Sequence, residues 1–203
     1  MSSSSPSFVA RERRELADLL ERLGPAAATL CEGWDTAHLA AHVVVRERRP
    51  DALVGLGAEQ VSPDSRLAAH THRVEDGLRT STSYPDVVGL LRDGPPPWSP
   101  MAWPVVGERL NVTEFAIHHE DVRRAQPDWS PRVLPRADQD ELWAAAGLFA
   151  RRAAGRRGLV LRRSDVPGQE KRFGAGCRTV EGEPLELLLW ASGRRDVAQV
   201  TVS

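Results

Sequence analysis

Apolar residues recur at intervals of three and four through the first three quarters of the chain, which is the spacing of amphipathic helices. In a first helix over 8–23, leucines at positions 16, 19, 20 and 23 form one apolar face, and Gly24-Pro25 ends the helix. The same spacing predicts further helices over 37–49, 63–79, 85–91, 106–124 and 138–154.

Polar residues directly before these segments supply helix start signals. Asp35 or Thr36 can cap the helix over 37–49, and Ser83 can cap the one over 85–91. The segment 94–104 is too rich in proline and glycine for a helix. We expect an ordered loop there that carries Trp98 and Trp103, either beside a cleft or packed onto the helices.

After Gly155 the pattern changes, because short apolar runs alternate with turn residues. It predicts a strand over 158–163, a strand and turn over 172–176, a helix over 184–190 and a terminal strand over 197–202. The expected fold is therefore mostly α. An antiparallel bundle of four substantial helices spans 8–155, a small C-terminal α/β appendage spans 156–203, and a disordered tail covers 1–7.

Charge and composition exclude several partners. Charged residues make up 27% of the 203 residues with a net charge of −1, and no basic stripe is concentrated enough to follow nucleic acid. No apolar run reaches membrane-spanning length, and the short Ser/Pro tail lacks the apolar core of a secretory signal. We expect a cytoplasmic protein, a monomer or homodimer, with its two cysteines reduced.

The strongest chemical signal is Glu114 followed four residues later by His118, because residues at this spacing share one face of a helix. A carboxylate and an imidazole so placed can hold one divalent cation, but such pairs are also common on amphipathic helices without one. A third ligand is available on the helix over 37–49, from His42 or, one turn earlier, His38. His119 leans toward the apolar side and is expected to be a core histidine with one hydrogen bond.

Three ligands of the type His/His/Glu leave a coordination position open, which is typical of catalytic rather than structural sites. The set suits zinc, nickel, iron or manganese to different degrees. Neither Cys31 nor Cys177 stands at ligand spacing from a histidine, so we expect Cys31 to pack before the second helix. His70 and His72 are expected to be solvated.

The chain resembles the mycothiol-dependent maleylpyruvate isomerase family within the wider group of DinB-like metal-binding bundles. The resemblance is carried by Leu30-Cys31-Glu32-Gly33-Trp34, by His38-Leu39-Ala40-Ala41-His42, by Val45-Arg46-Glu47-Arg48-Arg49-Pro50-Asp51 and by Glu114-Phe115-Ala116-Ile117-His118-His119-Glu120-Asp121.

The resemblance implies a DinB-like four-helix bundle that holds one divalent metal, typically zinc, through His42, Glu114 and His118. It also implies mycothiol or another low-molecular-weight thiol as cofactor and a small organic acid as substrate. Arg46, Arg48 or Arg49 can pair with a carboxylate of the substrate or of the thiol, or can simply offset the dipole at the helix end. Family members carry a C-terminal α/β domain, which is short here.

Two functions follow from these observations. The first is a thiol-dependent isomerase or S-transferase in which the metal activates a thiolate. The second is a non-catalytic metal-binding or ligand-sensing bundle, which the short C-terminal segment favours. A structural homodimer that uses the Trp-rich loop is a third interpretation.

Overall fold

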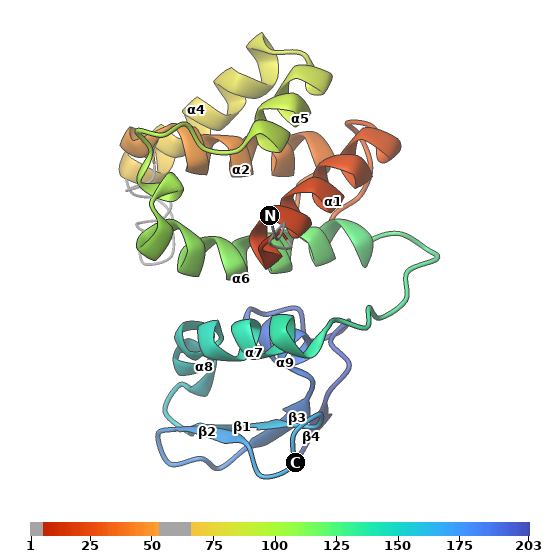
Figure 1. Cartoon of the computed structure of the whole chain (residues 1–203), viewed down its shortest axis with the longest axis vertical. Helices are drawn as coiled ribbons and strands as arrows, with labels where there is room; N and C mark the ends of the chain where they lie inside the picture. The colour runs from red at the N-terminus through yellow and green to blue at the C-terminus, as the bar shows by residue number, and fades with distance from the viewer. Residues whose placement is uncertain (1–5, 53–65) are drawn as a thin grey trace, which may run out of the picture. The chain divides into compact units, whose positions relative to one another are not determined.

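The computed structural model describes residues 6–52 and 66–203, which are mostly helical with one small sheet (Figure 1). Contacts between residues divide the chain into two compact units. The first contains residues up to 111 together with 118–127, and the second contains 112–117 together with 128–203. One continuous helix, α6 (Pro104–Arg123), contributes to both units.

The first unit is built from helices. They are α1 (Phe8–Leu23), α2 (Thr36–Arg48), α4 (Arg66–Ser81), α5 (Tyr84–Asp93), the short 3-10 helix η1 (Pro100–Ala102) and the outer turns of α6. Helix α2 packs against α4 and α5, and α1 packs against α5. The prediction of a helix over 8–23 is confirmed at both ends; of the helix predicted over 63–79, residues 63–65 lie outside the described part of the chain.

Side chains cap these helices as the sequence predicted. Asp35 accepts a hydrogen bond from the backbone N–H of His38 at 3.0 Å, which fixes the start of α2. Ser83 accepts from the backbone N–H of Asp86 at 3.4 Å at the start of α5.

A buried ion pair joins two helices of the first unit. The guanidinium of Arg13 on α1 forms two 2.5 Å hydrogen bonds with the carboxylate of Glu47 on α2, which is 1% exposed. The carbonyl oxygen of Glu47 in turn accepts a hydrogen bond from Ser99 at 2.6 Å, which ties the 94–104 loop to α2. The loop is thus ordered, but Trp98 and Trp103 are 61% and 53% exposed, so they are not packed onto the helices as core residues.

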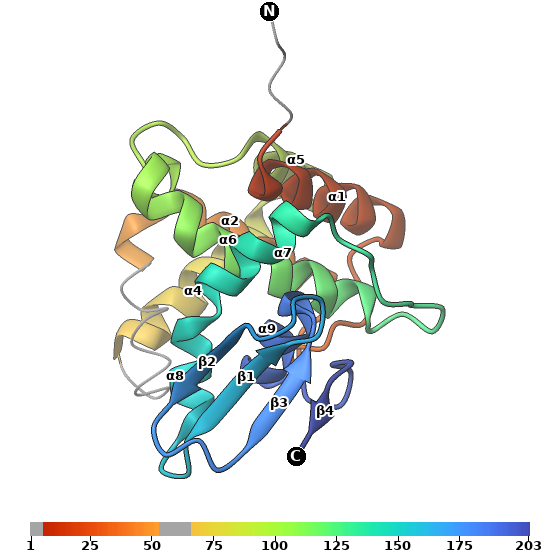
Figure 2. The same cartoon turned by 60° about the horizontal axis from the view of Figure 1, so that its bottom comes forward.

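The second unit combines three helices with a sheet. Helices α7 (Arg136–Ala145), α8 (Gly147–Ala154) and α9 (Pro184–Ala191) accompany strands β1 (Leu159–Arg163), β2 (Glu170–Phe173), β3 (Thr179–Gly182) and β4 (Thr201–Val202). Figure 2 shows the strands side by side in the order β2-β1-β3-β4. The β1–β3 pair is parallel and the two outer pairs are antiparallel.

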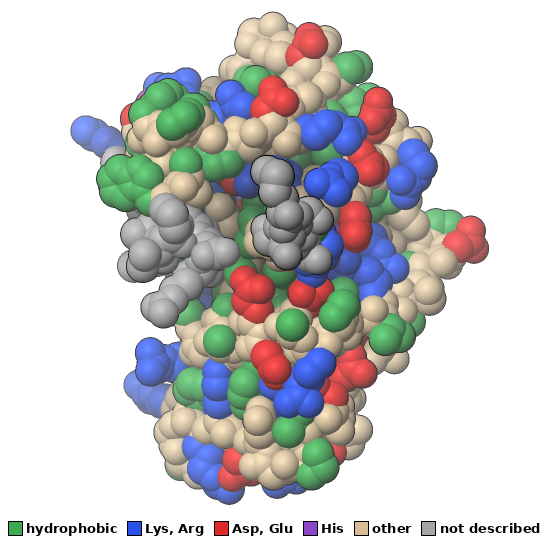
Figure 3. Space-filling view, in the orientation of Figure 1, with side chains coloured by type: hydrophobic (Ala, Val, Ile, Leu, Met, Phe, Trp, Pro, Cys, Tyr) green, Lys and Arg blue, Asp and Glu red, His purple; other side chains and the backbone are tan. Residues whose placement is uncertain are grey.

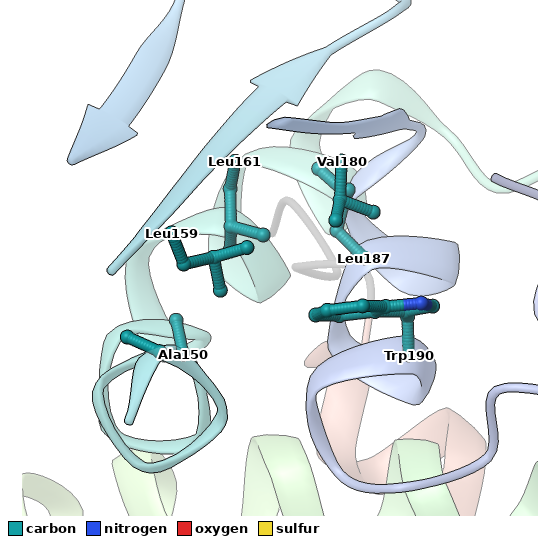
Figure 4. Packing of buried hydrophobic residues seen from close by; sticks show 7 residues of the cluster. Ala150, Leu159, Leu161, Val180, Leu187 and Trp190 are labelled. Carbon is teal, nitrogen blue, oxygen red and sulfur yellow. The ribbon is translucent and has the colours of Figure 1, made fainter. Parts of the chain in front are cut away.

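An apolar cluster between the sheet and its helices holds this unit together (Figure 4). Its buried members come from α8, β1, β3 and α9, namely Ala150, Ala154, Leu159, Leu161, Val180, Leu187 and Trp190. Burying aliphatic and aromatic side chains of this size contributes about 1.5–3 kcal/mol each. Strand β1 enters the sheet through Gly158, which has a φ of +77° and approaches the backbone of Gly176 so closely that a side chain has no room.

Two sequence predictions were wrong in detail, and one strand was not predicted. The single helix expected over 138–154 is two helices, α7 and α8, with the break at Ala146, directly before Gly147, which has a low helix propensity. Strand β3 was missed because Thr179–Gly182 is too short to show an alternating pattern. The terminal strand covers only Thr201–Val202, because residues 197–200 form turn hydrogen bonds instead.

The contact-based division places α7 and α8 with the sheet, whereas the sequence suggested that they continue the bundle over 8–155. The boundary between 155 and 156 stays a prediction.

Candidate metal centre

Helices α2 and α6 carry the residues that the sequence singled out. On α6, Glu114, His118 and Asp121 recur at intervals of four and three residues, which places them on one side of the helix. On α2, His42 lies in the middle of a helix whose start is fixed by the Asp35 cap. The local sequence therefore determines the face of the helix on which each of these residues lies.

The structure brings His42, Glu114 and His118 together. Each of the three offers one ligand atom, and these atoms all lie within 4.8 Å of one another. The imidazole rings of His42 and His118 meet edge to face, with centroids 5.2 Å apart and an angle of 69° between the ring planes. Two imidazole nitrogens and one carboxylate oxygen so gathered match the donor set of a divalent transition-metal site.

Each histidine of this trio is oriented by a second carboxylate. His42 Nδ1 lies 2.9 Å from Oε1 of Glu75, and His118 Nδ1 lies 3.0 Å from Oδ2 of Asp121. An ionised carboxylate has no proton to give, so Nδ1 must be the donor in both pairs. The Nε2 atom of each ring is then the nitrogen able to bind a cation, which is the usual arrangement of metal-binding histidines.

The sequence analysis gave Asp121 no role of its own and missed Glu75 altogether. Asp121 stands three residues after His118, so helical spacing was a usable signal. Glu75 lies on α4 and no spacing in the sequence relates it to His42.

A tight turn brings Trp34 and Cys31 to this region. The backbone N–H of Trp34 donates to the carbonyl of Cys31 at 3.0 Å, and Gly33 takes the position with a φ of +76° that favours glycine. The indole of Trp34 packs against the His42 ring at a centroid distance of 4.9 Å. The Cys-Glu-Gly-Trp segment is therefore a turn that shapes the surroundings of His42.

Cys31 lies in the turn before α2, as expected, but its side chain also reaches α6. Its Sγ atom lies 3.2 Å from Oδ2 of Asp121 and 3.9 Å from Nδ1 of His118. The backbone N–H of Leu30 also donates to the carbonyl of Asp121 at 3.0 Å, which anchors the turn on α6. Cysteine and histidine are 87 positions apart, so only the fold reveals the contact.

The three arginines at the end of α2 have different surroundings. Arg46 is 7% exposed and donates to Oδ1 of Asn111 at 2.6 Å and to the carbonyl of Leu110 at 3.1 Å. Arg48 donates to the carbonyl oxygens of Leu90 and Gly94. Arg46 stands one helical turn after His42 and so shares its side of α2, whereas Arg49 lies beyond the last residue of the helix.

Arg49 is instead half exposed and paired with Asp51 at 2.8 Å. The hydrogen bonds that Arg49 and His70 donate to Asp51 hold the pKa of that carboxyl well below its usual range. The charge of Arg49 is therefore paired with Asp51 at the surface.

The remaining histidines have other partners. His119 is buried and its Nδ1 lies 2.9 Å from Oε2 of Glu12, as expected for a core histidine with one hydrogen bond. His38 Nδ1 lies 2.7 Å from the Asp35 cap. Burial raises the pKa of Asp35, but hydrogen bonds from His38 outweigh it and lower the pKa overall.

His70 and His72 are 40% and 45% exposed, so both are largely solvated, as expected. Their rings lie near Asp51 and Glu75, at 3.2 Å and 3.5 Å. Next to the trio, a hollow of about 50 Å³ is lined by Trp34, His38, Ala41, His72, Glu75, Asp76 and Arg79. It is too small for an organic substrate.

The surface agrees with the balanced composition. On the face drawn in Figure 3, acidic and basic side chains are interspersed. Among the helices that the structure describes, none is both long and apolar enough to cross a membrane.

Fold and site together define a mostly helical protein with a candidate divalent-metal centre between α2 and α6. No family model matches the sequence, and no curated protein matches it. Two solved structures match the fold, both of the mycothiol-dependent maleylpyruvate isomerase. One has a TM-score of 0.54 at 21% identity, and the other, a histidine-to-alanine mutant, has 0.57 at 18%.

Each alignment covers 96% of this chain and 90% of the solved chain. The resemblance stated from the sequence is thereby confirmed at the level of the fold. The match extends over nearly the whole of both chains.

Proposed function

We propose that this chain is a metal-dependent, thiol-using enzyme of the isomerase or S-transferase type, with His42, Glu114 and His118 as ligands of one divalent cation. The carrying observation is that these three side chains converge from α2 and α6. The likeness in fold to a mycothiol-dependent maleylpyruvate isomerase supports the same assignment. In this proposal the helices form a DinB-like four-helix bundle.

The donor set fits zinc in particular, because two neutral imidazoles and one carboxylate suit this cation. Glu114 supplies one negative charge against the two positive charges of such an ion, so the ligands leave a net positive charge. That charge favours an anion in the open position, and a bound divalent cation would keep a small thiol in its thiolate form near neutral pH.

The chain's own residues then hold and orient the reactants. Glu75 and Asp121 fix the rings of His42 and His118, so the ligand geometry is set before substrate arrives. Arg46 donates to Oδ1 of Asn111 and to the carbonyl of Leu110 one turn from His42, and in this proposal its guanidinium also attracts a carboxylate of a small organic acid.

A thiol bound there would supply a thiolate for reversible addition to a conjugated double bond, and its departure after rotation about the resulting single bond would restore the thiolate and give the trans isomer. With a leaving group on the substrate, the same thiolate gives S-transfer instead. We expect the reaction to take place in the cytoplasm.

The test is metal analysis of the purified protein followed by thiol-dependent turnover with mycothiol and maleylpyruvate. We expect one divalent cation held by nitrogen and oxygen ligands alone, and His42→Ala should lose this cation together with turnover. His38→Ala, one turn earlier on the same helix and partly exposed, is the matched control and should retain the cation. A folded wild-type chain that binds no metal would refute the proposal.

The same experiment separates the enzyme from a non-catalytic metal-binding bundle. A cation that is bound but whose environment does not change on titration with mycothiol would favour the binding module. The alignment with the solved isomerase, which covers 90% of that chain, supports the enzyme over the binding module.

A further inference from the structure

Cys31, His118 and Asp121 form a second trio of potential ligands next to the first. Their ligand atoms lie within 4.8 Å of one another. The measured separations are 3.9 Å from Sγ to Nδ1, 3.2 Å from Sγ to Oδ2 and 3.0 Å from Nδ1 to Oδ2. The trio shares His118 with the proposed metal centre but uses the opposite nitrogen of its ring, because Nδ1 faces Asp121.

These separations are those of ligands around one small cation. With bonds of about 2.3 Å to sulfur and about 2.0–2.2 Å to nitrogen and oxygen, tetrahedral zinc holds neighbouring ligand atoms roughly 3.4–3.6 Å apart. Each measured separation lies within roughly 0.4 Å of that range. A cation could therefore replace the thiol proton of Cys31, while the imidazole proton of His118 moves from Nδ1 to Nε2 and the ring stays neutral, with little movement of the side chains.

The charge and burial of Cys31 and Asp121 also favour a bound cation. A thiolate and a carboxylate together neutralise a divalent cation, which lowers the cost of placing that charge in a partly buried position. Asp121 is fully buried and Cys31 is partly exposed, so a cation can enter from the cysteine side. The turn that carries Cys31 is fixed by Gly33 and by the Leu30 hydrogen bond to α6, so the sulfur is held in place before a cation binds.

We infer that Cys31, His118 and Asp121 form a second cation position, selective for a thiophilic divalent ion such as Zn²⁺, Co²⁺ or Cd²⁺. Thiolate sulfur prefers these ions over Mg²⁺ or Ca²⁺. The inference does not depend on thiol-dependent catalysis, although its position shares His118 with the proposed catalytic metal.

The test is titration with Co²⁺, followed by the near-ultraviolet absorption that a thiolate–cobalt bond produces. His42→Ala removes a ligand of the first trio only, so this variant isolates the second position. We expect the sulfur band in His42→Ala, its loss in the double variant His42→Ala/Cys31→Ser, and its retention in His42→Ala/Cys177→Ser. The exposed Cys177 makes the last variant a matched control for thiol chemistry.

X-ray absorption of the zinc-loaded His42→Ala variant gives an independent readout, because a zinc–sulfur distance of about 2.3 Å differs clearly from bonds to nitrogen and oxygen. Absence of the sulfur band in His42→Ala, or its survival after Cys31→Ser, overturns the inference. The single variant Cys31→Ser tests the proposed function separately. It keeps His42, Glu114 and His118, so it should still bind one cation, with no cation–sulfur bond.

Discussion

The Nδ1 atom of His42 on α2 lies 2.9 Å from Oε1 of Glu75 on α4, and both side chains are almost buried. This bond connects two helices through the ring of a proposed metal ligand. It fixes the rotation of the imidazole and, because the carboxylate accepts the proton of Nδ1, it increases the electron density available at Nε2.

Replacing Glu75 with glutamine should weaken cation binding about 10–100-fold while the fold is retained, because an amide still accepts the hydrogen bond but lacks the charge. Competition with a chromophoric chelator measures the change in affinity. The adjacent Asp76 is 62% exposed, and Asp76→Asn should leave the affinity unchanged. Equal affinities for Glu75→Gln and wild type would show that Glu75 does not support the ligand.

Arg46 is expected to stabilise the fold in addition to its proposed role in attracting a carboxylate. In Arg46→Met the buried Oδ1 of Asn111 loses its charged donor, which should lower the free energy of unfolding by about 1.5–3 kcal/mol. Arg49→Met, three residues later and half exposed, should change it by less than about 0.5 kcal/mol. Urea unfolding of both variants measures the difference, and similar small losses would contradict the bridging role of Arg46.

The second unit should lose stability in acid through Asp165. Its hydrogen bond from Arg163 lowers the pKa of Asp165 in the folded state, so the unfolded chain binds a proton more readily. The stabilisation is therefore present above the carboxyl's ordinary pKa of about 4 and is lost as pH falls through the lower folded value.

Unfolding free energies measured from pH 6 down to pH 2 check this expectation. Asp165→Asn should be less stable than wild type at pH 6 and should approach it at the acid end. A constant difference across that range would exclude Asp165 as a source of the acid sensitivity.

Three glycine-to-alanine replacements should have different effects on stability. Gly158→Ala places a Cβ 2.2 Å from the backbone nitrogen of Gly176 at a φ of +77°, and should cost about 3 kcal/mol or more. The added Cβ of Gly33→Ala meets no atom within 4 Å. This variant should lose only about 1–2 kcal/mol of unfolding free energy, because an alanine is strained at a φ of +76°.

Gly77 lies within α4 with open space around it, so Gly77→Ala should stabilise by about 0.5–1 kcal/mol. Thermal or urea unfolding of the three variants gives the order. A loss for Gly77→Ala as large as that for Gly33→Ala would show that backbone conformation does not explain the ranking.

The amino-acid sequence by itself determined the local features of this protein. Helix periodicity and capping residues placed α1, α2 and α5, and the i,i+4 spacing put Glu114 and His118 on one side of α6. These are short-range effects, set by the backbone geometry of one helix. The sequence also offered two candidates for the third ligand, His38 and His42, and the resemblance to a family favoured His42.

Only the tertiary structure decided which distant residues meet. It joined His42 to Glu75 across α2 and α4, and it brought Cys31 to His118 and Asp121. It also distinguished Arg46 from Arg49, which are three positions apart in the sequence: Arg46 is buried and Arg49 is half exposed. The physical reason is that such contacts arise when whole helices and turns pack against one another. The spacing of residues within one segment carries no information about that packing.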